Sequence, residues 1–320
     1  MNKLPNERAE TSSAELDASE RQWWQTFAEL EYRFAWAQPP AMQRILRGRY
    51  MREIVRLAGK GGHILELGCG TGWLCLALAR SGASNVCGLD FSPAQIAIAK
   101  MQAENAGLAD RVHFMCADAT SDCKPGENFD CVVIHGFLHH LDKTEIARTL
   151  TSVRRWLKPS GVLVVFEPIH HKDQPGKPCS RWERWQWILA RWSSRGRRWG
   201  LRRESSEEAR WRALFARRTV GVAPYGPSPK EIGFIPGELE SYLCRHFIVE
   251  RKQPCMVMSH LVVQEWLLRE LSHPRLSRLL LPCVARAAAW MDRRLLHQAE
   301  LPANLWVMTL FVCHLKVFNA

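Results

Sequence analysis

Long apolar runs are missing from this sequence. A helix that crosses a bilayer needs about 18 to 20 consecutive apolar residues, and no stretch of the chain reaches that length. The first 20 residues also lack an apolar core, so we expect no signal peptide. Together these absences predict a cytoplasmic location. Peripheral attachment to the inner face of an anionic membrane stays open as an alternative.

Cysteine pairs with the spacing of a metal site or a redox motif are missing as well. The chain has 11 cysteines, an odd number, and no C-x-x-C pair occurs among them. Cys75, Cys87 and Cys131 lie inside apolar runs, where cysteine behaves as a small hydrophobic residue. We therefore expect reduced thiols and no bound metal.

Two common nucleotide motifs are absent from the glycine-rich stretch ILELGCGTGW at 64–73. A P-loop needs Gly-Lys-Ser/Thr, which is missing, and the sixth position of a dinucleotide G-x-G-x-x-G frame is Trp73. What is present is three glycines at every second position after an apolar run, with Glu66 before them. Glycines there let the backbone adopt positive φ and let another group approach the main chain. A tight turn without a ligand is the alternative interpretation.

Short apolar runs alternate with helical patterns between residues 60 and 168. Strand patterns occupy 63–67, 85–90, 112–118, 129–136 and 161–168, and helical patterns occupy 72–81, 92–106 and 143–157. Repeated strand–helix–strand units predict a parallel sheet with helices on both faces. In such sheets ligands bind outside the carboxyl ends of the strands, where Asp90 and Asp118 follow the second and third strands.

Five motifs in this order resemble those of the class I S-adenosylmethionine-dependent methyltransferases: ELGCGTG, GLDFSPAQIAIAK, CADAT, FDCVVIHGFLHHL and LKPSGVLVVFEP. The resemblance is strong over roughly 60–168 and weaker toward the C-terminus. It implies an α/β fold with a Rossmann-like, seven-stranded, mostly parallel sheet and an N-terminal helical cap. This chain departs from the family pattern by helical insertions after the fifth and sixth strands. It also implies S-adenosylmethionine as the cofactor.

The same resemblance implies roles for individual residues. The three glycines border the methionine part of the cofactor, and Glu66 faces its ammonium group. Asp90 holds the ribose, Phe91 lies against adenine, and Asp118 accepts a hydrogen bond from the adenine amino group. The main-chain oxygen of His135 faces the methionine end. The implied cofactor-binding residues are Glu66, Gly68, Cys69, Gly70, Gly72, Asp90, Phe91, Asp118, Ala119 and His135.

Methyl transfer requires mainly that the acceptor be aligned, and a hydroxyl acceptor also needs a base. The candidate catalytic residues are His139 and His140 after the fourth strand, and Glu167 and His170 at the end of the fifth. Each has a structural alternative. The stretch LHHL is often found at a helix start in this family, His170 suits a solvated loop, and Glu167 can cap or orient a loop. The residues alone do not select one base.

Motifs for methylating nucleic acid bases are absent. Enzymes that act on exocyclic amines usually carry Asn or Asp and then Pro-Pro-Tyr/Phe after the fourth strand, where this chain has HGFLHHL. The Pro–Cys pairs at 254–255 and 282–283 do not follow the fourth or fifth strand either. The segments LHHL and FEP instead resemble those of enzymes that methylate small molecules, including quinone and lipid precursors. We therefore expect a small, hydrophobic or lipid-linked acceptor and disfavour nucleic acid as a partner.

Arginine is concentrated in one segment of the chain. Residues 181–218 contain twelve Arg and four Glu, a net charge of +8 within a total of +12. Trp182, Trp185 and Trp192 fall on one stripe of a helix there. Three interpretations stay open, in decreasing order of preference: a lid over the active site, a contact with an anionic membrane, and an arm that binds nucleic acid.

The N-terminal stretch 21–58 has the pattern of two helices broken at Pro39–Pro40, and the family resemblance implies that they cap the cofactor. Arg49, Tyr50 and Arg52 could reach the pocket, but we expect them to lie on a solvated face of the second helix.

The chain divides into four expected parts, and two further helices are expected at 259–271 and 275–298 before a last strand at 305–316. The parts are a helical cap at 1–59, a cofactor-binding core at 60–168, a basic insertion at 169–232 and a closing segment at 233–320. We predict a methyltransferase of a small acceptor. The alternatives are a methyltransferase of RNA or another large anionic substrate, and an inactive cofactor-binding partner subunit. The sequence does not indicate an oligomeric state.

Overall fold

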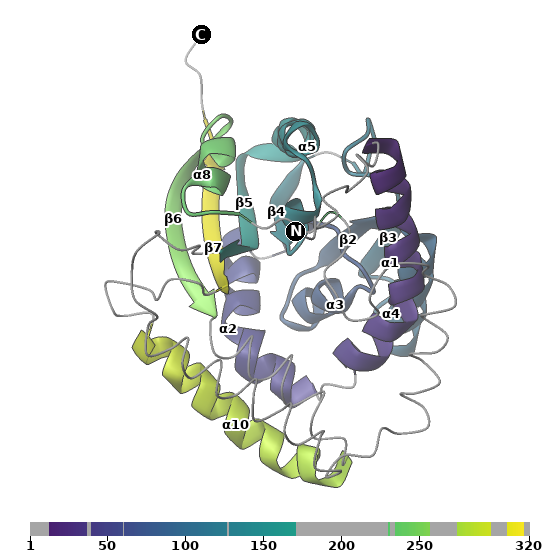
Figure 1. Ribbon diagram of the computed structural model, residues 1–320, viewed down its shortest axis with the longest axis vertical. Helices are drawn as coiled ribbons and strands as arrows, with labels where there is room; N and C mark the ends of the chain where they lie inside the picture. Colours follow the sequence, from purple (N-terminus) through teal and green to yellow (C-terminus); the bar gives the residue numbers. More distant parts are fainter. Residues whose placement is uncertain are drawn as a thin grey trace, which may run out of the picture.

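The computed structural model describes residues 13–36, 40–59, 61–126, 128–170, 230, 234–256, 274–295 and 306–316. Seven strands form one sheet in the order β3-β2-β1-β4-β5-β7-β6 (Figure 1). The strands are β1 (His63–Leu67), β2 (Asn85–Asp90), β3 (Val112–Cys116), β4 (Phe129–His135), β5 (Leu157–His170), β6 (Phe247–Met256) and β7 (Trp306–Leu315). The arginine-rich segment 181–218 and the helix expected at 259–271 lie outside the described residues.

The sheet is parallel except at β7. Strand β1 pairs in parallel with both β2 and β4, while β7 is antiparallel to β5 and to β6. The chain therefore runs outward from β1 to β3 and then returns to β4 on the other side of β1. At such a reversal the connections leave in opposite directions, and a crevice opens at the carboxyl ends of the strands. The predicted α/β fold class and its mostly parallel sheet are confirmed.

Helices cover both faces of the sheet because successive strand residues point to opposite sides. Ile64 belongs to one apolar cluster, and the next residue, Leu65, belongs to the other. The first cluster includes residues from α2 (Pro40–Ala58), α3 (Trp73–Arg80), α4 (Pro93–Asn105) and α10 (Pro274–Leu295). The second includes residues from α5 (Lys143–Trp156) and α8 (Glu238–Leu243).

Capping residues explain where two of the core helices begin. The Ser92 hydroxyl accepts a hydrogen bond from the main-chain N–H of Gln95, and Pro93 occupies the first turn of α4. Asp142 and Glu145 form a capping box at the start of α5. These helices start within a residue of their predicted positions. Strand β5 is longer than predicted. Its first residue, Leu157, pairs with Phe129 of β4 ahead of a register shift, and the segment 162–170 pairs with β7.

The N-terminal helix α1 (Ser13–Trp36) begins earlier than the sequence pattern indicated. It contacts α4, and Figure 1 shows it beside α4 and β3, whereas α10 contacts α2 in the lower part of the view. Pro282 lies inside α10. Within the described ranges, no helix is long and apolar enough to span a membrane.

Candidate functional site

The glycine turn joins β1 to α3 at the carboxyl edge of the sheet. Gly68, Gly70 and Gly72 all have positive φ, at 66°, 52° and 79°. A Cβ at Gly72 would lie 2.6 Å from the ring of Phe114, and a Cβ at Gly68 would lie 2.6 Å from the ring of Phe137. Close packing against these two rings is therefore one reason for glycine, in addition to the approach of a ligand.

Gly72→Ala should lower the free energy of unfolding by about 2 to 5 kcal/mol. The left-handed backbone costs a residue with a Cβ about 1 to 2 kcal/mol, and displacing Phe114 costs about 1 to 3 kcal/mol more. Gly107→Ala is the matched control, because Gly107 has φ 63° but a Cβ added there would meet no atom within 4 Å. Urea denaturation of both variants measures the difference, and equal losses would show that Phe114 yields without cost.

Asp90 ends β2 and turns its carboxylate toward the glycine turn. One oxygen, Oδ2, accepts from the N–H of Gly70 at 2.9 Å, and Oδ1 accepts from the N–H of Ser92 at 2.9 Å. Burial raises the pKa of Asp90 to about 6, although these two hydrogen bonds act in the opposite direction. The carboxylate is thus held at the crevice by two main-chain groups.

Glu66 and Cys69 lie beneath the turn. Glu66 is buried in β1 and accepts a hydrogen bond from the Cys75 thiol at 2.8 Å. Burial raises the pKa of Cys69 to about 12, so this thiol is protonated at neutral pH. All ten cysteines in the described residues are free. The predicted role of Glu66 toward an ammonium group stays a prediction.

Asp118 follows β3, next to the buried Ala119. Its Oδ1 accepts from the main-chain N–H of Thr120 at 2.9 Å and from its hydroxyl at 2.7 Å, and its Oδ2 accepts from Arg21 of α1. Burial alone would raise the pKa of Asp118, but the contacts with Thr120 and Arg21 outweigh it and hold the pKa below its ordinary value. The Arg21 guanidinium lies 5.1 Å from the centroid of the Phe91 ring.

Glu167 of β5 organises the loop after β4. Its side chain is fully buried, and Oε1 accepts from the N–H groups of Phe137 and Leu138, both at 2.7 Å. Its Oε2 lies 2.7 Å from Nδ1 of His139. Glu167 therefore holds the short helix Leu138–His140 and orients the His139 ring, which agrees with the structural alternative without excluding a chemical role for His139.

His140 faces the cap helix α1. Its Nδ1 lies 3.3 Å from Oε1 of Glu20, and its ring meets the edge of Trp24 at a centroid distance of 5.1 Å. Glu20 also accepts from the main-chain N–H of Lys230 at 2.9 Å. His170 is the last residue of β5, and its side chain lies outside the described part of the structure.

Lys230 ties α1 to α5. Its ammonium group lies 2.5 Å from a carboxylate oxygen of Asp17 and 2.9 Å from one of Glu145. Burial alone would lower the pKa of Lys230, but hydrogen bonds and charge attraction from both carboxylates outweigh burial and raise it. These contacts hold the cap helix at the carboxyl edge of the sheet.

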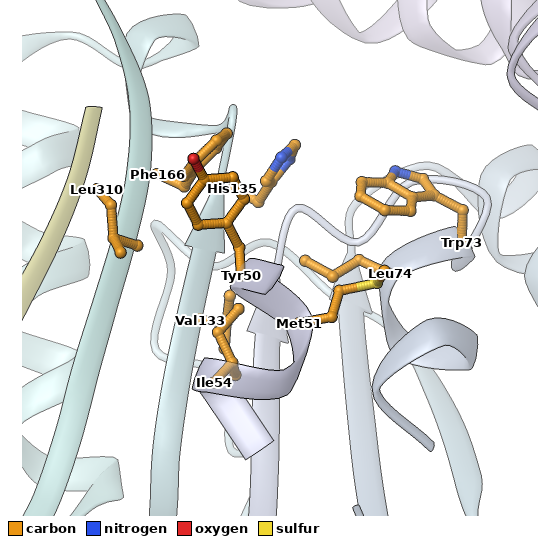
Figure 2. A pocket seen from close by; sticks show the side chains of 9 residues that line it. All are labelled: Tyr50, Met51, Ile54, Trp73, Leu74, Val133, His135, Phe166 and Leu310. Carbon is orange, nitrogen blue, oxygen red and sulfur yellow. The ribbon is translucent and has the colours of Figure 1, made fainter. Parts of the chain in front are cut away.

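An apolar pocket opens beside the glycine turn, between α2 and the sheet (Figure 2). Figure 2 shows aromatic rings above aliphatic side chains, and the lining consists of Tyr50, Met51, Ile54, Trp73, Leu74, Val133, His135, Phe166 and Leu310. His135 stacks on Phe166 at 4.9 Å and meets Trp73 edge-on at 5.2 Å.

The expectation for Tyr50 was wrong, because its side chain lines this pocket instead of lying on a solvated face. Its hydroxyl donates to the main-chain oxygen of Cys255 in β6 at 2.9 Å, which fixes the ring over the pocket. Arg52 is exposed, as expected. The side chain of His135 was also missed, because only its main-chain oxygen entered the prediction.

The site thus combines a glycine turn, two carboxylates at strand ends, two histidines each beside a carboxylate, and an apolar pocket. No group of three or more His, Cys, Asp or Glu side chains that could hold a metal ion occurs within the part of the chain that the structure describes. This arrangement can bind a ribose and a base by hydrogen bonds, enclose an apolar molecule beside them, and accept a proton.

Parts of this chain are similar to known methyltransferases. Residues 64–161 match the family described as methyltransferase domain. The chain is 30% identical over 141 residues to a ubiquinone biosynthesis O-methyltransferase of Coxiella burnetii, covering 44% of this chain and 54% of that protein. It is 31% identical over 148 residues to the O-methyltransferase cnsE of Penicillium expansum, covering 45% of this chain and 52% of that protein. The chain thus spans about half the length of these curated relatives.

Among solved structures, the [4+2]-cyclase SpnF has a TM-score of 0.50 to this protein at 20% identity. The match covers 84% of this chain and 81% of that chain. At this identity it shows a shared fold and leaves the reaction undecided.

Proposed function

We propose that this chain, in which residues 64–161 are a class I S-adenosylmethionine-dependent methyltransferase domain, transfers the methyl group of S-adenosylmethionine to a small, hydrophobic or lipid-linked acceptor. The observation that carries the proposal is the apolar pocket next to the glycine turn, because it brings an apolar acceptor site and the predicted cofactor site to one edge of the sheet. The O-methyltransferase names of the relatives support a hydroxyl as the acceptor group.

The residues at the crevice fit the cofactor. Every second residue of the turn from Gly68 to Gly72 lacks a side chain, and the Asp90 carboxylate can accept from two ribose hydroxyls. Phe91 and Asp118 offer a ring face and a carboxylate oxygen to adenine. S-adenosylmethionine, when bound, supplies a methyl group that its sulfonium has already activated.

The residues of the chain bind the acceptor, align it with the methyl group and keep water out of the site. The pocket is lined by no Asp, Glu, Lys or Arg, so it favours an apolar or aromatic portion of an acceptor over a phosphate or carboxylate. Alignment of reacting groups in such a site is worth about 7 to 11 kcal/mol at best. Tyr50, fixed by its hydrogen bond to Cys255, and the stacked ring of His135 make the walls rigid.

Two histidine–carboxylate pairs are the candidates for the proton acceptor. In the first, Glu167 stands behind His139, and a proton on the Nδ1 of His139 would make its Nε2 the basic nitrogen. In the second, Glu20 of the cap helix stands beside His140. A carboxylate behind an imidazole stabilises the protonated ring once it has taken a proton. The imidazoles of both pairs follow β4, whose last residue, His135, lines the pocket.

The test is methyl transfer with radiolabelled S-adenosylmethionine and separate small-molecule, lipid and RNA fractions of a cell extract. We expect label in the small-molecule or lipid fraction, and label in the lipid fraction would support contact with a membrane surface. Label in the RNA fraction alone would favour the alternative substrate class, for which the basic segment 181–218 is the supporting feature. Cofactor binding without any labelled product would favour an inactive partner subunit.

Affinity for the cofactor should fall as the pH drops below about 6, since the pKa of Asp90 is raised to about 6 and ribose hydroxyls donate to its charged form. The loss should approach about tenfold per pH unit at lower pH. The effect on folding has the opposite sign. Because the folded pKa exceeds the ordinary value of 3.8, Asp90 favours folding at low pH, and this contribution is lost as the pH rises through about 6.

Calorimetric titration between pH 5 and pH 7 measures this dependence. Asp90→Asn is the control, because it cannot lose a proton and should remove the part of the profile that belongs to Asp90. An unchanged profile in that variant would assign the pH dependence to another group.

A further inference from the structure

Arg21, on the cap helix α1, donates a hydrogen bond to the Asp118 carboxylate oxygen that the adenine amino group would use. Both hydrogen bonds from Thr120 go to Oδ1 of Asp118, so Oδ2 is the oxygen left for an amino group of a ligand. Arg21 donates to that same oxygen. Its guanidinium also lies over the ring of Phe91, the second residue that the adenine end would contact.

The position of Arg21 follows from how α1 is held. The preceding residue, Glu20, is buried and bonded to the main chain of Lys230, and Asp17, one turn earlier, is paired with the ammonium group of Lys230. These contacts fix the backbone of α1 beside α4. The long side chain of Arg21 therefore starts from a fixed point and reaches across to Asp118.

The Arg21 side chain can leave this position without stranding a buried charge. Its relative exposure is 50%, and that of the Asp118 side chain is 26%. Such a partly exposed ion pair contributes little to stability, because water solvates both groups when it opens. The adenine amino group can then donate to the vacated oxygen, while the helix itself stays in place.

We infer that Arg21 is an internal competitor for the adenine subsite: S-adenosylmethionine binds by displacing the Arg21 guanidinium from Asp118 and Phe91. The inference rests on the proposed function, because it takes the adenine contacts of the cofactor from it. Arg21 thereby reduces the affinity for every ligand that carries the adenine group. The competition is partly an ion pair, so added salt, which screens such pairs, weakens it.

The test is titration of the full chain with S-adenosylmethionine, and separately with 5′-methylthioadenosine, which carries adenine and ribose but no amino acid end. Arg21→Ala should bind both ligands about three- to tenfold more tightly than the unaltered protein, since an exposed ion pair and a cation–π contact no longer have to be broken. This ratio should shrink toward one as the salt concentration rises. Arg21→Lys, which keeps a positive charge near Asp118, should bind with an affinity between those of Arg21→Ala and the unaltered protein.

Arg56→Ala is the matched control, because Arg56 is an exposed arginine on α2 that pairs within its own helix with Glu53. It should leave both affinities unchanged, and thermal melting checks that all variants are folded. Equal or weaker binding by Arg21→Ala would overturn the inference, because Arg21 would then be neutral or would contact the bound adenine favourably. If the unaltered protein and Arg21→Ala both fail to bind S-adenosylmethionine, the proposed function fails, which is a distinct result.

Discussion

Asp90→Ala should weaken the binding of S-adenosylmethionine by at least about a hundredfold. The substitution removes a carboxylate that would accept from two ribose hydroxyls, and hydrogen bonds to a charged group are worth about 1.5 to 3 kcal/mol each. It also removes the acceptor for the N–H groups of Gly70 and Ser92, so the glycine turn loses its anchor to β2. Both effects act in the same direction on binding. Calorimetric titration of the two proteins measures the change.

Asp110→Ala is the control for that experiment. Asp110 is an exposed carboxylate just before β3, at the opposite edge of the sheet from the glycine turn. Its removal changes the net charge by the same amount and should leave the affinity within about twofold, since single exposed charges contribute little. Similar affinities for Asp90→Ala and Asp110→Ala would contradict the assignment of Asp90 to the ribose.

Glu167→Ala should lower the free energy of unfolding by about 3 to 5 kcal/mol. Its carboxylate is fully buried and accepts from two main-chain N–H groups while it also contacts His139. Without it the N–H groups of Phe137 and Leu138 lose their acceptor, and a buried donor without a partner costs about 1 to 3 kcal/mol. The alanine also leaves a cavity beneath the loop after β4. Urea denaturation gives the free energy directly.

Two further variants separate these causes. Glu167→Gln keeps an amide oxygen for the main-chain donors, so it should lose less stability than the alanine variant. Glu250→Ala removes an exposed carboxylate that pairs with His314 at 2.6 Å, and it should cost at most about 1 kcal/mol. If Glu167→Ala were no more costly than Glu250→Ala, Glu167 would not be the centre of this loop.

Most of the core could be predicted from the sequence because its signals are local. The short apolar runs that make β1 and β4, and the Ser92–Pro93 start of α4, are each contained in a few neighbouring residues. The glycine turn could be predicted in the same way, because positive φ at alternate positions favours glycine. The resemblance to the methyltransferases rests on the same kind of signal, short motifs that follow one another in order along the chain.

The contacts of the cap could not be predicted, because they join residues that are far apart in the sequence. Arg21 and Asp118 are separated by 97 positions, Lys230 and Glu20 by 210, and Tyr50 and Cys255 by 205. Nothing in the neighbourhood of Tyr50 distinguishes a pocket wall from an exposed helix face. Only the closing strands β6 and β7, which bring Cys255 and Leu310 to α2, turn that ring into part of the site.

The basic segment 181–218 lies outside the described residues, so its roles as a lid, a membrane contact or a nucleic acid arm stay predictions. The site at the carboxyl edge of the sheet does not depend on the choice among them. Its glycine turn, Asp90 and the apolar pocket all come from residues of the core, of α2 and of β7.

The central claim is that the crevice beside the glycine turn binds S-adenosylmethionine. Equilibrium dialysis of the full chain against radiolabelled S-adenosylmethionine tests it most directly, with excess unlabelled S-adenosylhomocysteine as the competitor. We predict saturable binding of one cofactor per chain, displaced by the competitor and strongly reduced in Asp90→Ala. Retention of no label by the folded protein, or of label that neither the competitor nor the substitution reduces, would contradict the account.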